Sequence, residues 1–125
     1  MKKRTQIYKG VFYLHLTFKK TGQTLVVSLI GELDHHNAVN VREEIDRRFS
    51  SSNSKNLVFN LQKLEFMDSS GLGILIGRYK TVSAIGGKTA IAAPSVLTKR
   101  LIELAGVHKI IPIYGTAQEA IGGVA

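Results

Sequence analysis

The chain has 125 residues, the size of one domain, and a net charge of +8 from 17 basic and 9 acidic residues. It contains no cysteine, which excludes disulfides, thiolate nucleophiles and cysteine-based metal sites. No apolar stretch approaches the roughly 20 residues of a transmembrane helix. The basic start, residues 1–4, is followed by polar residues rather than by the apolar core of a signal peptide. We therefore expect a cytoplasmic globular protein.

The positive charge is concentrated at the start of the chain. The first 22 residues hold six basic groups and no acid, whereas the rest holds eleven basic and nine acidic groups. A basic head can attract nucleic acid or anionic lipid, but no aromatic or glycine pattern of a nucleic-acid module accompanies it. We interpret residues 1–10 as a flexible leader and 11–125 as the folded domain, and we predict no direct contact with nucleic acid or a membrane.

Two strands are predicted first. Apolar and polar residues alternate over residues 12–18, which predicts a strand with one buried face. Residues 25–30 are almost continuously apolar, which is typical of a central strand. The turn at 19–23 joins the two as a hairpin.

A polar loop at 31–37 and a helix come next. Asp34 or Asn37 is placed to cap this helix, and the serine-rich segment 50–54 ends it as a surface linker. Four apolar residues recur at helical spacing and define its buried face. They are Ala38, Val41, Ile45 and Phe49.

The third strand, 57–61, is followed by a lead-in at 62–67 and a second helix. Gly86 and Gly87 stop this helix. The residues that we expect to face inward share one side of it. They are Leu72, Leu75, Ile76, Tyr79 and Val82.

The last third of the chain predicts a short strand at 89–92, a helix opened by Pro94 and ended by Gly106, and a strand at 110–114. Pro112 marks that strand as a sheet edge. The inward face of the Pro94 helix is expected to carry Leu97, Leu101 and Leu104. A final short helix is expected to begin at a capping box formed by Thr116 and Glu119.

Strands that alternate with helices predict an α/β fold with a mixed sheet. Within it, the corner 68–73 carries two hydroxyls, one carboxylate and two glycines. If the second and third strands run parallel, the loop 34–36 and the Ser69 loop emerge at the same sheet edge, where open α/β sheets bind ligands. The two loops are therefore expected to form one surface.

Ser69 lies at the expected helix start, where N–H groups are free and the helix dipole is positive. A phosphate there would add about −1.5 to −2 charges. The helix would stabilise it, whereas Asp68 and an acidic or apolar partner would repel it. This pattern indicates a phosphorylation switch; the simpler interpretation is that Ser69 or Asp68 only caps the helix.

Gly71, Gly73 and Gly77 occupy the first turns of the same helix. Each costs about 0.5–1 kcal/mol relative to alanine in a helix interior. Either a partner must approach the backbone closely, or Gly73 and Gly77, which are one turn apart, seat the helix tightly on the sheet. Leu72 is an anchor for a partner if exposed and part of the core if buried.

Nothing in the chain predicts catalysis, a metal or another cofactor. Neighbouring histidines, His35 and His36, are expected to point in different directions, and no third metal ligand stands at suitable spacing. The corner is not a Gly-x-Ser-x-Gly elbow and lacks the lysine and length of a phosphate-binding loop. A nucleotide-binding or hydrolytic enzyme that uses the surface around Asp34 and Ser69 remains the alternative from another functional class.

Two runs, 31–36 (GELDHH) and 66–73 (FMDSSGLG), resemble the anti-sigma factor antagonists, a family with the STAS domain, and most of all the antagonists of the anti-sigma-F factor in spore-forming bacteria. The resemblance extends from about residue 10 to the C-terminus and leaves the basic leader outside it. It implies a single STAS-type α/β domain with a mixed sheet and helices mainly on one side. Shorter similar stretches lie at 77–80, 85–87, 99–101, 106, 109–111 and 123–125.

The resemblance also implies a partner-switching function rather than an enzymatic one. The unphosphorylated protein would bind a nucleotide-bound anti-sigma factor serine kinase and release the sigma factor. Phosphorylation of Ser69, but not Ser70, would end binding, and a PP2C-type serine phosphatase would restore it. Sporulation is the implied process, with a general stress sigma factor as the alternative. The partner-binding residues implied are Asp34, Asp68, Ser69, Ser70, Gly71, Leu72 and Gly73.

Overall fold

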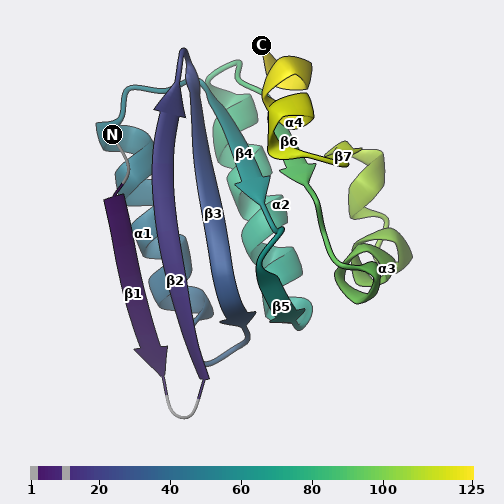
Figure 1. Ribbon diagram of the computed structural model, residues 1–125. Coiled ribbons are helices and arrows are strands. Elements are labelled where there is room, and N and C mark those ends of the chain that lie inside the picture. Colours follow the sequence, from purple (N-terminus) through teal and green to yellow (C-terminus); the bar gives the residue numbers. More distant parts are fainter. Residues whose placement is uncertain (1–2, 10–11) are drawn as a thin grey trace.

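Within residues 3–9 and 12–125, which the computed structural model describes, seven strands form one mixed sheet (Figure 1). Side chains are described from residue 13 onward. The sheet order is β1-β2-β3-β4-β6-β7, and β5 pairs with β3. The antiparallel strands are β1 (Lys3–Lys9), β2 (Phe12–Thr21) and β3 (Thr24–Leu33). The other strands are β4 (Asn56–Asn60), β5 (Leu64–Met67), β6 (Thr89–Ala92) and β7 (Ile113–Tyr114). β4 and β5 pair parallel with β3, β6 pairs parallel with β4, and β7 pairs parallel with β6.

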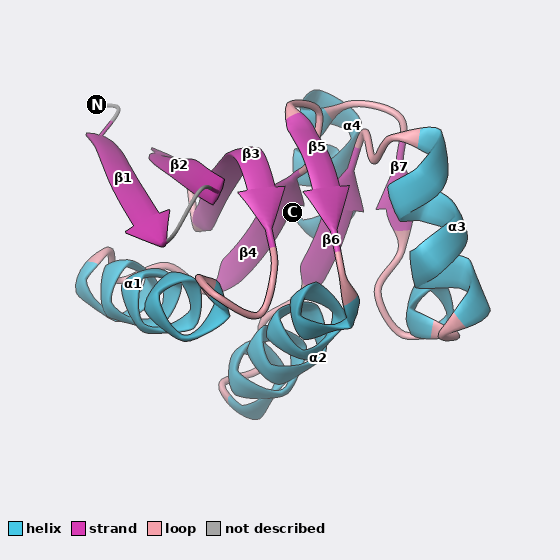
Figure 2. Cartoon of the chain, turned by 90° about the horizontal axis from the view of Figure 1, so that it is seen from below, coloured by secondary structure: helices cyan, strands magenta, loops and turns pink. Residues whose placement is uncertain are grey.

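Among the described residues, three of the four helices supply buried side chains to the core on one side of this sheet, and the fourth supplies the core on the other side (Figure 2). Two helices cover one face, a third lies beyond β7, and the fourth covers the opposite face. They are α1 (Ala38–Ser51), α2 (Ser69–Ala84), α3 (Val96–Leu104) and α4 (Ala117–Val124), with a 3₁₀ turn η1 (Val107–Lys109) after α3. The predicted α/β fold class is confirmed.

Two cores hold the layers together because strand side chains alternate between faces. On β3, Leu25, Val27 and Leu29 are buried in the large core beneath α1 and α2. Val26 points the other way and joins a smaller core with Ala120 of α4. Five helix residues, Val41, Ile45, Phe49, Leu75 and Val82, are buried as predicted.

β1 is a strand that the sequence analysis does not predict. Residues 3–9 pair antiparallel with β2, where we expect a flexible leader. The pairing is made by the backbone, so the basic composition gave no sign of it. Residues 1, 2, 10 and 11 of the same region, including Lys2, lie outside the described residues.

β5 was also missed, because its four residues follow a buried, exposed, exposed, buried pattern that gives no clear period. It runs parallel to the end of β3, with a register shift between Gly31 and Glu32. Gly31 has φ +119°, and a Cβ there would lie 2.6 Å from the Tyr13 carbonyl oxygen, so only glycine fits this irregularity. The corner at Asp68 therefore follows β5 rather than the strand at 57–61.

The predicted inward face of α3 is wrong for two of its three leucines, and only Leu101 packs, partly buried, against the large core. Leu97 and Leu104 are 77% and 81% exposed, whereas Thr98 and Ile102 are buried. Thr98 can be buried because its hydroxyl accepts a hydrogen bond from the Ser95 hydroxyl at 3.0 Å. Ser95, not Pro94, caps the helix by accepting from the Thr98 N–H.

The end of the chain follows the prediction more closely. The strand expected at 110–114 is reduced to Ile113–Tyr114, because residues 110 and 111 form a turn and a bend that follow η1. Its position at the sheet edge, indicated by Pro112, is confirmed. The Thr116 hydroxyl accepts from the Glu119 N–H at 3.1 Å, which is the predicted cap of α4.

The orientation of α3 can be tested by two truncations. We expect Ile102→Ala to lower the free energy of unfolding by about 2–5 kcal/mol, because it empties a fully buried position. Leu104→Ala, on the exposed side of the same helix, should change it by less than about 0.5 kcal/mol. Urea unfolding measures both, and the opposite ranking would restore the leucine face predicted from the sequence.

Candidate functional site

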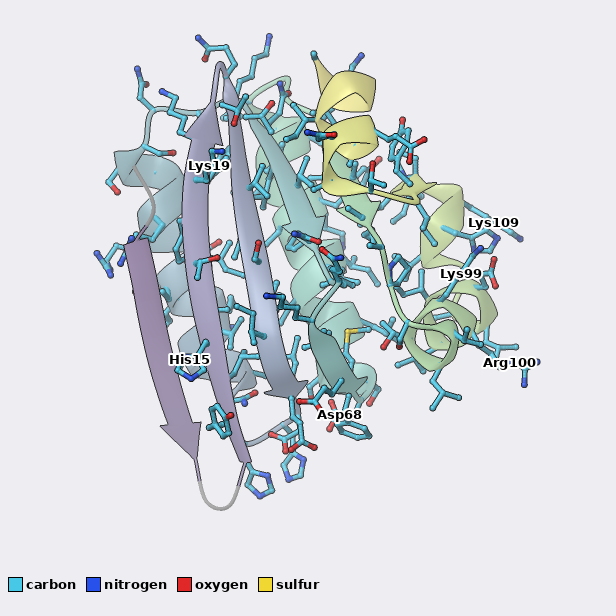
Figure 3. All side chains as sticks on the ribbon, viewed as in Figure 1. His15, Lys19, Asp68, Lys99, Arg100 and Lys109 are labelled. Carbon is cyan, nitrogen blue, oxygen red and sulfur yellow. The ribbon has the colours of Figure 1, made fainter. Side chains whose placement is uncertain are left out.

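Two loops meet at the end of the sheet where β3 and β5 finish. Because these strands are parallel and paired, the loop into α1 and the loop into α2 leave the same edge. Asp68 marks this edge beyond the tip of β5 in Figure 3. The predicted meeting of the two loops is confirmed, since the His35 N–H donates to Asp68 Oδ2 at 3.2 Å.

Asp68 is the residue that caps α2. Its backbone is extended, and its Oδ1 accepts a hydrogen bond from the Ser70 N–H at 2.8 Å. Ser69 is the first helical residue and is exposed. No hydrogen bond joins the Ser69 hydroxyl to any residue in the described part of the chain. Of the two interpretations left open for Ser69, capping therefore belongs to Asp68, and the Ser69 hydroxyl is accessible.

The loop 34–37 is held by its own side chains. Asp34 is only 4% exposed, and its Oδ1 accepts from the His36 N–H at 2.8 Å. Asn37 is fully buried; its side chain accepts from the Asp34 N–H and donates to the Glu32 carbonyl oxygen. Asn37 stands at the N-cap position of α1, but its side chain makes no capping bond there. Asp34 or Asn37 was predicted to cap α1, but both side chains instead organise the loop.

The two histidines face each other rather than pointing apart, as we had expected. Their ring centroids are 4.0 Å apart. Each ring lies near a different carboxylate: His35 Nδ1 is 3.6 Å from Asp68 Oδ2, and His36 Nδ1 is 3.5 Å from Asp34 Oδ2. Among the described residues, no group of three side chains is placed to hold a metal ion.

The glycines of α2 differ in the space that surrounds them. A Cβ on buried Gly71 would lie 2.2 Å from Met67 Cγ, so this position is a packing requirement. Gly73 and Gly77 have no atom within 4 Å of the place a Cβ would take. Tight seating on the sheet, the packing explanation considered for Gly73 and Gly77, is therefore wrong for both and describes Gly71 instead.

Leu72 takes an intermediate position. It is partly buried and packs against the large core, as do Ile76 and Tyr79. Leu72 is therefore neither the fully exposed anchor nor the fully buried core residue that the two expectations describe. The exposed surface at the start of α2 therefore consists of Ser69, Gly73 and the outer parts of Ser70 and Leu72.

An ion pair ties α2 to α1 behind this surface. Arg78 Nε lies 2.9 Å from Asp46 Oδ1, and Arg78 is only 8% exposed. Burial lowers the pKa of Arg78, while the Asp46 charge acts in the opposite direction and Arg42 adds to the lowering. This pair was not predicted from the sequence, although an arginine on an otherwise inward-facing side of α2 was an available signal.

The STAS domain family matches residues 15–120 of the chain. An anti-sigma F factor antagonist from Paenibacillus polymyxa is 40% identical over 97 residues, covering 78% of this chain and 83% of that protein. The chain belongs to the STAS-domain anti-sigma factor antagonists. These are regulators and not enzymes, in agreement with the absence of a predicted catalytic motif.

Solved structures give the same result. The anti-sigma factor antagonist SpoIIAA in its unphosphorylated form has a TM-score of 0.76 and 31% identity, covering 87% of this chain and 95% of that one. SpoIIAA of Bacillus in the phosphorylated form has a TM-score of 0.69 and 31% identity, covering 88% and 99%. None of the helices in the described part of this antagonist combines the length and apolar character needed to cross a bilayer.

Two alanine substitutions separate the roles of the α2 glycines. Gly73→Ala should raise the free energy of unfolding by about 0.5–1 kcal/mol, because alanine favours the helix and meets no neighbour. Gly71→Ala should lower it by about 1–3 kcal/mol, because its methyl group displaces Met67. Denaturant unfolding of both variants checks the pair; a stabilised Gly71→Ala would contradict the packing explanation.

Proposed function

We propose that the unphosphorylated protein binds an anti-sigma factor that is also a serine kinase, in its nucleotide-bound state, and so releases a sigma factor. Phosphorylation of Ser69 ends this binding, and a PP2C-type serine phosphatase restores it. The observation that carries the proposal is the accessible Ser69 hydroxyl on the first residue of α2, beside the open backbone at Gly73.

Electrostatics explains how such a switch needs no change of fold. A phosphate at the first helical residue meets free N–H groups and the positive end of the dipole, so the isolated domain tolerates it. A desolvated interface does not, because burying a charge of about −2 without a partner costs several kcal/mol. A loss of about 4 kcal/mol weakens binding about a thousandfold.

Phosphorylation is a documented state of a similar protein, since SpoIIAA was solved with and without it. The names of the relatives describe antagonists of anti-sigma factors. Both points support a kinase partner and a modified serine for this chain. The match of the 66–73 run supports Ser69 as the modified residue and the half-buried Ser70 as its unmodified neighbour.

The partner-binding residues take different parts in the proposed interface. Ser69, Gly73 and Leu72 meet the partner directly, since they are exposed or partly so. Asp34 and Gly71 are buried, so they act by shaping the loop and by allowing α2 to approach Met67. Asp68 and Ser70 border the site.

We further propose sporulation as the process regulated, because the 31–36 run resembles antagonists of anti-sigma-F factors and such an antagonist is 40% identical. The competing assignment is a general stress sigma factor, and an anti-sigma-B factor antagonist from Bacillus subtilis is 28% identical over 89% of the chain. Binding measured against both kinds of anti-sigma factor from the same cell separates the two assignments.

The acceptor residue is tested with three variants and the cognate kinase. Ser69→Ala should bind the kinase with ATP or ADP as tightly as the unphosphorylated protein. Because it lacks the acceptor hydroxyl, its affinity should not fall during incubation with ATP. Ser69→Asp should bind at least about tenfold more weakly, because its single charge imitates part of the phosphate. Ser70→Ala is the control and should still accept one phosphate. Intact mass with peptide mapping locates the phosphate, and calorimetry gives the affinities; phosphate on Ser70 would sink the proposal.

The open backbone at Gly73 gives a second test. Gly73→Gln should fold at least as stably as the parent but bind the kinase more than about tenfold more weakly, because its side chain holds the partner away from α2. Ala84→Gln, at the exposed far end of the same helix, is the matched control and should bind normally. Equal affinity of the two variants would place the interface elsewhere.

A further inference from the structure

The carboxylate of Asp68 contacts both loops of the site at once. Oδ1 accepts from the Ser70 N–H at 2.8 Å, and Oδ2 accepts from the His35 N–H at 3.2 Å. We propose that Asp68 is a positioning residue, which fixes the loop 34–37 against the Ser69 corner so that both present one preformed surface to the anti-sigma factor. This inference rests on the proposed function and assigns Asp68 a role within it.

Capping alone does not account for an aspartate here. A cap needs one acceptor, and serine or asparagine supplies it about equally well. The second oxygen of Asp68 bonds a loop that lies 33 residues away in the sequence. A carboxylate offers two acceptors and no donor, whereas asparagine would oppose the His35 N–H with its own N–H.

The loop 34–37 is hydrogen-bonded within itself but has few ties to the corner. Asn37 and Asp34 bond each other and the nearby backbone. Towards the corner, the backbone bond from the Asp68 N–H to the Leu33 carbonyl oxygen, at 3.2 Å, acts beside the carboxylate. Without the carboxylate contact, the loop would have to be ordered when the partner binds, and that cost lowers affinity.

The contact also explains how a negative charge can adjoin a phosphate acceptor. The Asp68 carboxylate is 29% exposed and already accepts two N–H groups, one of them at the positive end of α2. Its oxygens are therefore bonded to N–H groups of the protein, whereas the Ser69 side chain is exposed to solvent.

Two pairs of variants test the role. Asp68→Ser and Asp68→Asn keep an acceptor for Ser70 but lose the bond to His35. His35→Ala keeps the backbone N–H, whereas His35→Pro removes it. Proline is favoured at this position, because His35 follows Asp34 in a turn closed by the Asn37 N–H and the Asp34 carbonyl oxygen at 3.3 Å. Both His35 variants lack the ring, so their difference isolates the N–H.

The measurements are amide hydrogen exchange over residues 34–37 in the full chain, the melting temperature, and the affinity for the anti-sigma factor kinase with ATP or ADP. We expect Asp68→Ser and Asp68→Asn to melt within a few degrees of the parent. Their loop amides should exchange about tenfold faster, and their affinity should fall about tenfold. His35→Pro should differ from His35→Ala in the same direction.

Affinities equal to the parent in the Asp68 variants, or no difference between His35→Pro and His35→Ala, would overturn the positioning role and leave Asp68 as a cap. Faster exchange with unchanged affinity would overturn it as well. Hydrogen exchange needs no partner. If the parent protein itself bound no anti-sigma factor, the proposed function would fail, while the exchange data would still decide whether Asp68 holds the loop.

Discussion

The parallel pairing of β5 with the end of β3 is the constraint on which the rest of the site depends. β5 has only four residues, but it directs the chain into α2 beside the loop that enters α1. The backbone bond between Asp68 and Leu33 and the contact between Asp68 and His35 both follow from this pairing. A different partner for β5 would separate the two polar loops, although each would keep its local hydrogen bonds.

The helix that starts at this corner has a sequence poorly suited to a helix, and tertiary packing compensates. Gly73 and Gly77 weaken α2 without any packing gain. Burial of Ile74, Leu75 and Val82 beneath the sheet, together with the ion pair between Arg78 and Asp46, holds the helix in place. The buried face of α2 therefore stabilises the helix, and its exposed face is available to a partner.

The charges near Ser69 are arranged so that a phosphate would be the dominant new feature. The chain is strongly basic overall, yet the basic residues labelled on α3, such as Arg100, lie away from Asp68 in Figure 3. The carboxylates of Asp34 and Asp68 are engaged by backbone N–H groups. A phosphoryl group on an accessible hydroxyl would then add about −1.5 to −2 charges on the solvent side of the corner, which is the physical basis of the proposed switch.

The sequence by itself determined the fold class, the long elements, the cap of α4 and the corner at 68–73, because these depend on periodicity, on turn residues and on contacts a few residues apart. It also supported the family, through two runs whose order of residues is specific. Only the tertiary structure decided the contacts between distant segments. These include β1 on β2, β5 on β3, the burial of Ile102 rather than Leu104, and the division of the α2 glycines into one needed for packing and two that are open. The spacing of α3 allowed two adjacent faces to be buried, and only its place beyond β7 selected one. Local patterns cannot specify such choices, since each depends on which surface another part of the chain presents.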